Sequence, residues 1–117
     1  MSNLTVAWGT CGDDSHWCDF LNLDLSTDHF KELKGVYIIG NADGVVRVGS
    51  GIIKDRITAH RNDKEITAYK NLKITWAQVN ANQMEGVEKF LADHYDPKVG
   101  ERFPDRTPIS VNLPKSN

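Results

Sequence analysis

The chain has 117 residues, a length typical of one domain and sufficient to bury a core without disulfide or metal cross-links. Hydrophobic residues make up 39% and charged residues 26%, a globular composition that excludes a wholly disordered chain. The formal net charge of −2 argues against a polybasic protein coated with nucleic acid, although net charge says nothing about where the charges lie.

The N-terminal segment, residues 1–25, mixes Trp8, Trp17 and Phe20 with Gly and Asp and has no regular periodicity. This predicts an irregular arm or short strand whose aromatic side chains pack on the main domain. The segment lacks the basic and apolar stretches of a signal peptide. No stretch of the chain approaches the ~20 apolar residues that span a membrane. We therefore expect a cytoplasmic protein.

Cys11 and Cys18 lie in this segment, with His16 between them. They could form a disulfide, or half of a zinc site with His29 as a further ligand. A structural zinc site normally has four ligands, and the chain has no second cysteine pair. We therefore expect two small, reduced, partly buried thiols.

The first regular elements follow this arm. Either Ser26 or Thr27 can supply the N-cap of a short helix through about residue 33. Residues 35–40 and 45–49 are short and rich in β-branched side chains, and Asp43-Gly44 between them is a hairpin-turn signal. We expect an antiparallel hairpin here.

The rest of the chain alternates helix and strand. We expect a helix over about 52–60, a short helical or turn piece over 64–71, a strand over 73–79, a helix capped by Asn82 and ending near Tyr95, and a short strand over 109–111. The order β-β-α-β-α predicts a small α+β domain with a three-stranded antiparallel sheet flanked by helices.

Charge divides unevenly along the chain. Residues 1–30 carry five aspartates and no Lys or Arg (net −5), residues 31–73 carry nine bases and five acids (net +4), and residues 74–117 carry five bases and six acids (net −1). A basic middle segment is thus masked in the total. Its bases can contact a phosphate backbone, or they form an ordinary solvated surface. The candidates for nucleic-acid binding are Lys34, Lys54, Arg61, Lys64 and Lys70.

Glu88 fits a purely structural explanation poorly. Met84, Val87 and Leu91 form an apolar stripe on the last helix, and Glu88 flanks that stripe. A carboxylate in this position costs stability unless it is paired or binds a cation. The alternative is a glutamate at the edge of the stripe that reaches solvent or an arginine.

Arg56 and His60 are four residues apart and so share one face of the predicted helix. The helix opens after Gly49-Ser50-Gly51, and the free N–H groups at a helix start favour anions such as phosphate. The alternative is a flexible turn followed by a solvated Arg and His.

Tyr37 lies in the first strand of the hairpin, and Arg47 stands among valines in the second. A three-residue loop, 42–44, places both side chains on the same face of the hairpin. A two-residue loop reverses this arrangement. The sequence leaves the two alternatives open.

Taken in order, these residues resemble the GIY-YIG nuclease superfamily. Gly35-Val36-Tyr37 is similar to the GIY element, and Arg47-Val48-Gly49 stands where the YIG element is expected. Arg56 and His60 resemble the helical Arg and the following His, and Glu88 resembles the metal-binding Glu on a later helix.

Asn112 is similar to the terminal Asn of the family. The resemblance covers about residues 33–114. It implies a GIY-YIG-like domain over 31–117, with residues 1–30 as an acidic arm packed on it.

The resemblance implies a divalent-metal-dependent endonuclease that hydrolyses phosphodiester bonds in DNA. Glu88 would hold a Mg²⁺ or Mn²⁺ ion that keeps most of its waters. Tyr37 would help to activate or orient water, and Arg56 would bind the scissile phosphate. His60 would exchange protons, since its ordinary pKa is about 6.5. Structural positions near the site would be Gly35, Gly49 and Asn112.

Arg47 departs from the family, which has a second tyrosine there. A guanidinium cannot relay a proton, but it can bind phosphate and so join the catalytic set. One alternative is therefore a catalytically degenerate domain that binds nucleic acid or a protein without cleavage. Another is an interaction module whose acidic arm covers the basic face. Because we expect no separate specificity domain, a homodimer or a protein partner would supply specificity.

Overall fold

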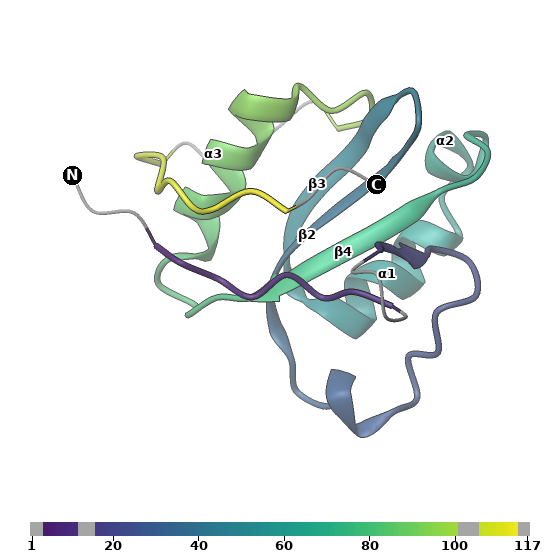
Figure 1. Ribbon diagram of the computed structural model, residues 1–117, viewed down its shortest axis with the longest axis horizontal. Coiled ribbons are helices and arrows are strands. Elements are labelled where there is room, and N and C mark those ends of the chain that lie inside the picture. Colours follow the sequence, from purple (N-terminus) through teal and green to yellow (C-terminus); the bar gives the residue numbers. More distant parts are fainter. Residues whose placement is uncertain (1–3, 12–15, 101–105, 115–117) are drawn as a thin grey trace.

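The computed structural model describes residues 4–11, 16–100 and 106–114 (Figure 1). Within them the chain forms strands, three α-helices and one 3-10 helix, η1. The bounds are Cys18–Asp19 for β1, Asp28–Phe30 for η1, Lys34–Asn41 for β2, Gly44–Ile52 for β3, Ile53–Arg61 for α1, Lys64–Thr67 for α2, Lys73–Gln78 for β4 and Met84–Tyr95 for α3. No helix of the described residues is long and apolar enough to cross a membrane.

The strands form one antiparallel sheet in the order β1-β4-β2-β3. The predicted small α+β domain with an antiparallel sheet is confirmed. The predicted count of three strands is wrong, because Cys18 and Asp19 add a two-residue strand beside β4, opposite Ile74 and Lys73. A strand this short has no apolar alternation that the sequence could reveal.

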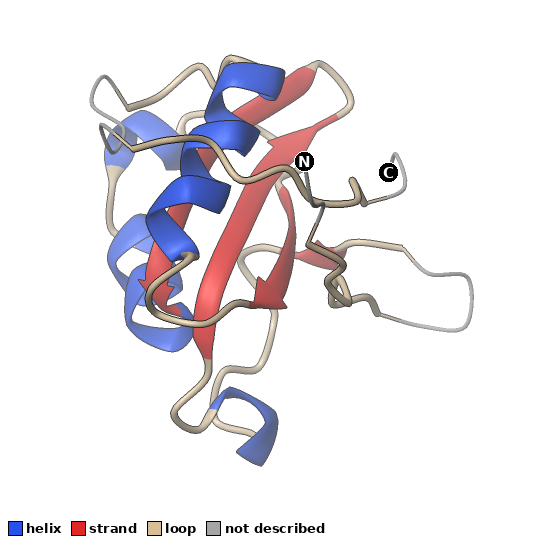
Figure 2. Ribbon diagram, turned by 90° about the vertical axis from the view of Figure 1, so that its left-hand side faces the viewer, coloured by secondary structure: helices blue, strands red, loops and turns tan. Residues whose placement is uncertain are grey.

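Helices cover both faces of the sheet. α1 and α3 lie on opposite sides of it (Figure 1), whereas η1 lies beyond one end of the sheet (Figure 2). Successive side chains of a strand point to opposite faces, so β2 contributes to both cores. The core on the α1 side includes Tyr37, Ile39, Ile53, Ile57 and Trp76. The core on the α3 side includes Val36, Ile38, Val48, Val87 and Leu91.

The register of the β2–β3 hairpin decides whether Tyr37 and Arg47 share a face. Asn41 pairs with Gly44 across a two-residue turn, but the pairing then shifts, so that Ile39 lies opposite Arg47. This bulge inserts one extra residue into β3 and reverses the facing of every residue beyond it. Tyr37 therefore lies opposite Gly49, on the face that Arg47 also occupies. The two-residue turn together with the bulge has the effect of a three-residue loop.

α3 begins later than predicted. Asn82 does not cap it; the amide of Met84 donates to the carbonyl of Asn80, and the helix starts from that turn. The predicted end is confirmed at Tyr95. Asp96 adopts a left-handed conformation with φ of 49° just before the proline, where the chain cannot continue as a helix.

The predicted helix over 52–60 is confirmed as α1, displaced by one residue. The helix expected through residue 33 is shorter, with only Asp28–Phe30 forming η1. Glu32 has a φ of 58°, and a left-handed residue at this point ends the helical turn. Thr27 precedes η1 without a side-chain capping bond.

The N-terminal segment packs on the sheet through backbone contacts. The amide of Gly9 donates to the carbonyl of Trp76 over 2.6 Å, and Thr75 Oγ1 donates to the Gly9 carbonyl over 2.8 Å. Leu4 forms a parallel bridge with Val111. This single bridge replaces the short strand expected over 109–111.

Cys11 and Cys18 form a disulfide, so the expectation of reduced thiols is wrong. Cys11 and His16 form an antiparallel bridge, and the Cα atoms of Cys11 and Cys18 lie 5.1 Å apart, within the range a disulfide needs. His29 does not join them, since its Nε2 accepts a hydrogen bond from Trp76 Nε1 over 3.0 Å. Since Cys11 and Cys18 bond each other and His29 bonds Trp76, they do not form the zinc site considered as an alternative.

Candidate active site

Tyr37 and His60 form the centre of the candidate site. Tyr37 Oη and His60 Nε2 lie 2.5 Å apart, which joins the middle of β2 to the last turn of α1. Gly49 lies opposite Tyr37, and a Cβ there would overlap the phenol oxygen. The glycine predicted to be structural therefore makes room for this hydrogen bond. Tyr37 has no exposed surface, whereas His60 is 7% exposed.

Arg56 lies one helical turn before His60 on the same face of α1. The chain enters α1 through Gly51, whose φ of +130° favours glycine. A Cβ at Gly51 would lie 3.4 Å from Cγ and Cδ of Arg56, so the arginine side chain lies along this turn. Its Nε atom is buried and has no hydrogen-bond acceptor within the described residues. An unsatisfied buried donor is costly, and a bound anion would satisfy it.

Glu88 comes from α3, in the opposite layer of the domain, and is 8% exposed. Its Oε1 accepts a hydrogen bond from Ser50 Oγ over 2.6 Å. Burial raises the pKa of the Glu88 carboxyl group, while the Ser50 hydrogen bond and the charges of Arg47 and Arg56 partly oppose this rise. Glu88 therefore does not reach solvent freely, and its buried carboxyl group is under the influence of two arginine charges.

The two arginines connect the parts of the site. Burial lowers the pKa of His60 to about 4, with help from the positive charges of Arg47 and Arg56 and against the negative charge of Asp63. The same two arginines act on Glu88. The positive charges of Arg47 and Arg56, at the β3 edge of the sheet, therefore act on both His60 and Glu88, although His60 and Glu88 come from helices on opposite faces. Among the five predicted catalytic residues, Tyr37 and His60 are hydrogen-bonded, and the charges of Arg47 and Arg56 act on both His60 and Glu88.

Sequence reasoning gives Ser50 no role. It lies opposite Val36 in the hairpin, so its side chain points to the face that α3 covers. The bulge decides this facing, and the only signal in the sequence is the position of Ser50 between two glycines.

The bases predicted to bind nucleic acid have different surroundings. Arg61 is used within the fold, since its Nε and Nη2 donate to the carbonyls of Phe20 and Leu23 over 3.0 and 2.6 Å. The guanidinium thereby ties the N-terminal segment to α1. The lysines remain exposed on four different elements or turns: Lys34, Lys54, Lys64 and Lys70.

Asn112 and Gly35 have structural positions. The Asn112 side chain accepts from the Val6 amide over 2.7 Å and donates to the Val6 carbonyl over 2.9 Å. It therefore joins the two terminal segments of the described chain. Gly35 lies where a Cβ would overlap the carbonyl oxygen of Ala77, so it allows β2 and β4 to approach.

A divalent cation at this site would have one protein carboxylate, that of Glu88. No group of three or more His, Cys, Asp or Glu side chains suited to a metal occurs in the described residues. A single carboxylate still fits Mg²⁺, which keeps several of its waters. The buried carboxylate beside a hydroxyl is an oxygen donor set of the kind that hard cations prefer.

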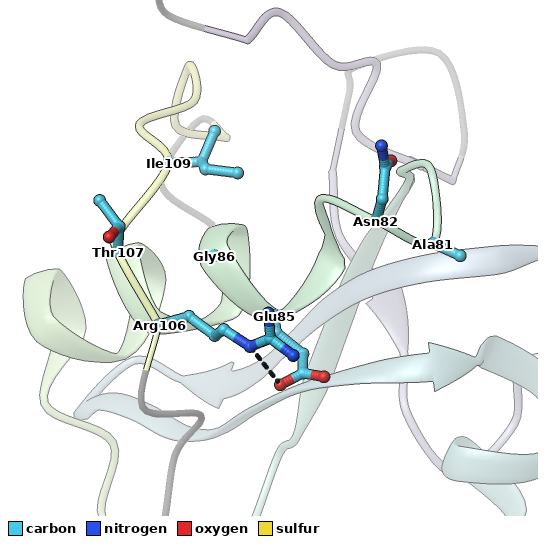
Figure 3. A pocket seen from close by; sticks show the side chains of 7 residues that line it. All are labelled: Ala81, Asn82, Glu85, Gly86, Arg106, Thr107 and Ile109. Atoms are coloured by element: carbon cyan, nitrogen blue, oxygen red, sulfur yellow. Dashed lines mark ion pairs between the residues drawn. The ribbon is translucent and has the colours of Figure 1, made fainter.

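A separate cavity of about 360 Å³ lies beside the start of α3 (Figure 3). Glu85 and Arg106 line it and form an ion pair, with Oε2 and Nε 3.4 Å apart. Gly86 and Ile109 also line it. None of the predicted site residues belongs to this lining, so the cavity is distinct from the cluster around Tyr37.

Comparisons with known proteins return no match among family models, curated proteins or solved structures. The resemblance to GIY-YIG nucleases therefore rests on the residues described above.

Proposed function

We propose that the protein is a divalent-metal-dependent endonuclease of GIY-YIG type that acts on DNA. The observation that carries the proposal is the cluster at the β3 edge: the Tyr37–His60 hydrogen bond, Glu88 and two arginines that influence both His60 and Glu88. Phosphodiester hydrolysis needs these same kinds of groups, which bind a phosphate, stabilise its developing charge and move protons.

Arg56 is the residue that we assign to the scissile phosphate. Its buried Nε has no acceptor within the described residues, and a phosphate oxygen would supply one. Arg47 lies on the same side of the sheet as Tyr37 and adds a second positive charge. Together they would stabilise negative charge in the transition state.

His60 is the proposed proton acceptor, and Tyr37 is a positioning residue. The pKa of about 4 makes His60 neutral at pH 7, so one ring nitrogen is free to accept a proton. Tyr37 is fully buried and fixes the imidazole through its hydroxyl group. A bound phosphate would offset the charges of Arg47 and Arg56 and raise the pKa of His60 toward that of a useful base.

Glu88 would hold the Mg²⁺ or Mn²⁺ ion. When bound, the cation supplies positive charge for the phosphate oxygens and the leaving group. The buried position of Glu88 supports this role, since an ionised carboxylate in such a position gains from a cation.

Cleavage assays with matched variants test the proposal. Plasmid and single-stranded DNA are incubated with the protein in Mg²⁺ or Mn²⁺, with RNA as a competing substrate. We expect Glu88→Ala and Arg56→Ala each to reduce the cleavage rate by about 10²–10³-fold. Asp93→Ala is the control, because this exposed residue of α3 pairs with Lys89 outside the cluster. Cleavage by Glu88→Ala at the wild-type rate would contradict the proposal.

A second candidate function, nucleic-acid binding without cleavage, is favoured by Arg47 at the place of the family's second tyrosine. It predicts salt-sensitive DNA binding and no cleavage with any divalent cation. Fluorescence anisotropy over a range of salt concentrations measures the binding. Failure to bind at low salt excludes this function.

We also propose that the protein is cytoplasmic and acts as a homodimer or with a protein partner. In the cytoplasm, Cys11 and Cys18 would be thiols rather than the disulfide, and alkylation in intact cells distinguishes the two states. Specificity would come from a homodimer or a protein partner, which sedimentation with and without DNA would detect.

A further inference from the structure

Ser50 lies between the two layers that build the candidate site. It belongs to β3, the edge strand, and its pairing with Val36 turns it toward α3. Its hydroxyl group donates to Oε1 of Glu88 over 2.6 Å, across 38 residues of sequence. Through this hydrogen bond, β3 of the hairpin contacts the Glu88 carboxylate of α3 directly.

The glycines on either side make this contact specific to residue 50. Gly49 cannot carry a side chain because Tyr37 Oη occupies the space, and Gly51 has a φ of +130°. The strand thus presents one hydroxyl to Glu88 while its neighbours serve Tyr37 and Arg56. A carboxylate can rotate about its last bond, and a hydrogen bond to one oxygen limits that rotation.

We propose that Ser50 is a positioning residue for a divalent cation: it holds Oε1 of Glu88 so that Oε2 faces the cation. The inference rests on the proposed function for the identity of Glu88 as the ligand. Groups that bond a metal ligand orient it, and their removal typically weakens metal binding by about 10–100-fold.

The test measures Mn²⁺ binding by isothermal titration in the absence of nucleic acid, and then the Mn²⁺ dependence of cleavage. We expect Ser50→Ala to weaken Mn²⁺ binding by about 10-fold or more and to raise the Mn²⁺ concentration for half-maximal cleavage in proportion. The rate at saturating Mn²⁺ should fall much less. Ser50→Thr keeps the hydroxyl group and should restore the affinity.

Thr58→Ala is the matched control. It also removes a hydroxyl group, but one on the exposed face of α1 that bonds the Lys54 carbonyl. It should bind Mn²⁺ as the wild type does. If Ser50→Ala does not fold, Ser50→Cys retains a side chain of similar shape with a weaker donor and provides the same comparison.

Wild-type Mn²⁺ affinity in Ser50→Ala, an unrestored affinity in Ser50→Thr, or no binding by the wild type overturns the inference. The proposed function fails separately. A wild type that binds Mn²⁺ through Glu88 and Ser50 but never cleaves DNA contradicts the nuclease and leaves Ser50 as a positioning residue. Conversely, if cleavage depends on Glu88 but Ser50→Ala binds Mn²⁺ with wild-type affinity, only the role of Ser50 is contradicted.

Discussion

The two outer strands of the sheet are β1 and β3. Polar groups near β1 and its neighbour β4 (the β1 edge) differ from those near β3 and the helices beside it (the β3 edge) in how well their hydrogen bonds and charges are satisfied. At the β1 edge, Cys18 is in a disulfide, Thr75 donates to the Gly9 carbonyl and Trp76 donates to His29. At the β3 edge, Arg56 Nε is buried without an acceptor in the described residues, and Glu88 is buried with a raised pKa.

The difference separates a part of the molecule that serves stability from one that costs stability. Satisfied hydrogen bonds and a cross-link at the β1 edge stabilise the fold. Buried, poorly compensated charge at the β3 edge destabilises it, and such arrangements occur where a protein binds or reacts. Removing a buried side chain at the β1 edge should therefore lower stability, whereas neutralising Glu88 at the β3 edge should raise it at pH 7.

The largest expected effect is at the β1 edge. Phe20 follows β1, is fully buried in the core on the α1 side, and Phe20→Ala should lower the free energy of unfolding by about 3–5 kcal/mol. Leu21→Ala, at a neighbouring residue that is 57% exposed, should change it by no more than about 0.5 kcal/mol. Urea denaturation measures both. Equal changes in the free energy of unfolding for the two variants would contradict the stabilising role of the buried side chain at the β1 edge.

His60 should make stability depend on pH. Its pKa falls from 6.5 in the unfolded chain to about 4 in the folded one, so the unfolded chain binds more protons between these values. Stability from this group is complete above pH 6.5 and is lost as the pH falls through 4, by about 3 kcal/mol in total. Unfolding curves of wild type and His60→Gln from pH 4 to 7 should converge at the acid end. Parallel curves would contradict the burial of neutral His60.

The disulfide should contribute less. It closes a short loop, and the loss of loop entropy in the unfolded chain corresponds to about 2 kcal/mol. Replacing both cysteines with serine should lower the free energy of unfolding by that amount while cleavage per folded molecule stays the same. A loss of cleavage without a loss of stability would show that the β1 edge also serves the site.

The smallest expected effect has the opposite sign. Because the folded state raises the pKa of Glu88, its ionised form is disfavoured on folding at pH 7. Glu88→Gln keeps an acceptor for Ser50 and should increase the free energy of unfolding by about 0.5–2 kcal/mol while cleavage is lost. Below the unfolded pKa of 4.5 the gain should disappear, as thermal melts over pH 3.5–7 will test. A destabilised Glu88→Gln at pH 7 would contradict the contrast between the edges.

Local patterns in the sequence were sufficient for most of the fold. The hairpin, α1, β4 and the end of α3 follow from β-branched runs, helical spacing and a proline, which act within a few residues. The two-residue strand β1 and the disulfide could not be predicted in this way. β1 depends on the return of the N-terminal segment to β4, which is distant in sequence, whereas the disulfide accompanies the Cys11–His16 bridge.

The candidate residues of the site could also be named from the sequence, but their arrangement could not. Spacing along a helix predicts that Arg56 and His60 share a face, because helix geometry is local. The facing of Tyr37 and Arg47 depends on one extra residue in the bulge, which the turn sequence does not reveal.

The sequence by itself determined an antiparallel α+β domain and the residue types that form the site. Only the tertiary structure decided that Glu88 of α3 bonds Ser50 of β3 and is influenced by the charges of Arg47 and Arg56. The physical reason is range. Backbone propensities act over a few residues, whereas the burial and charge that shift the pKa of His60 and Glu88 arise from elements brought together by packing.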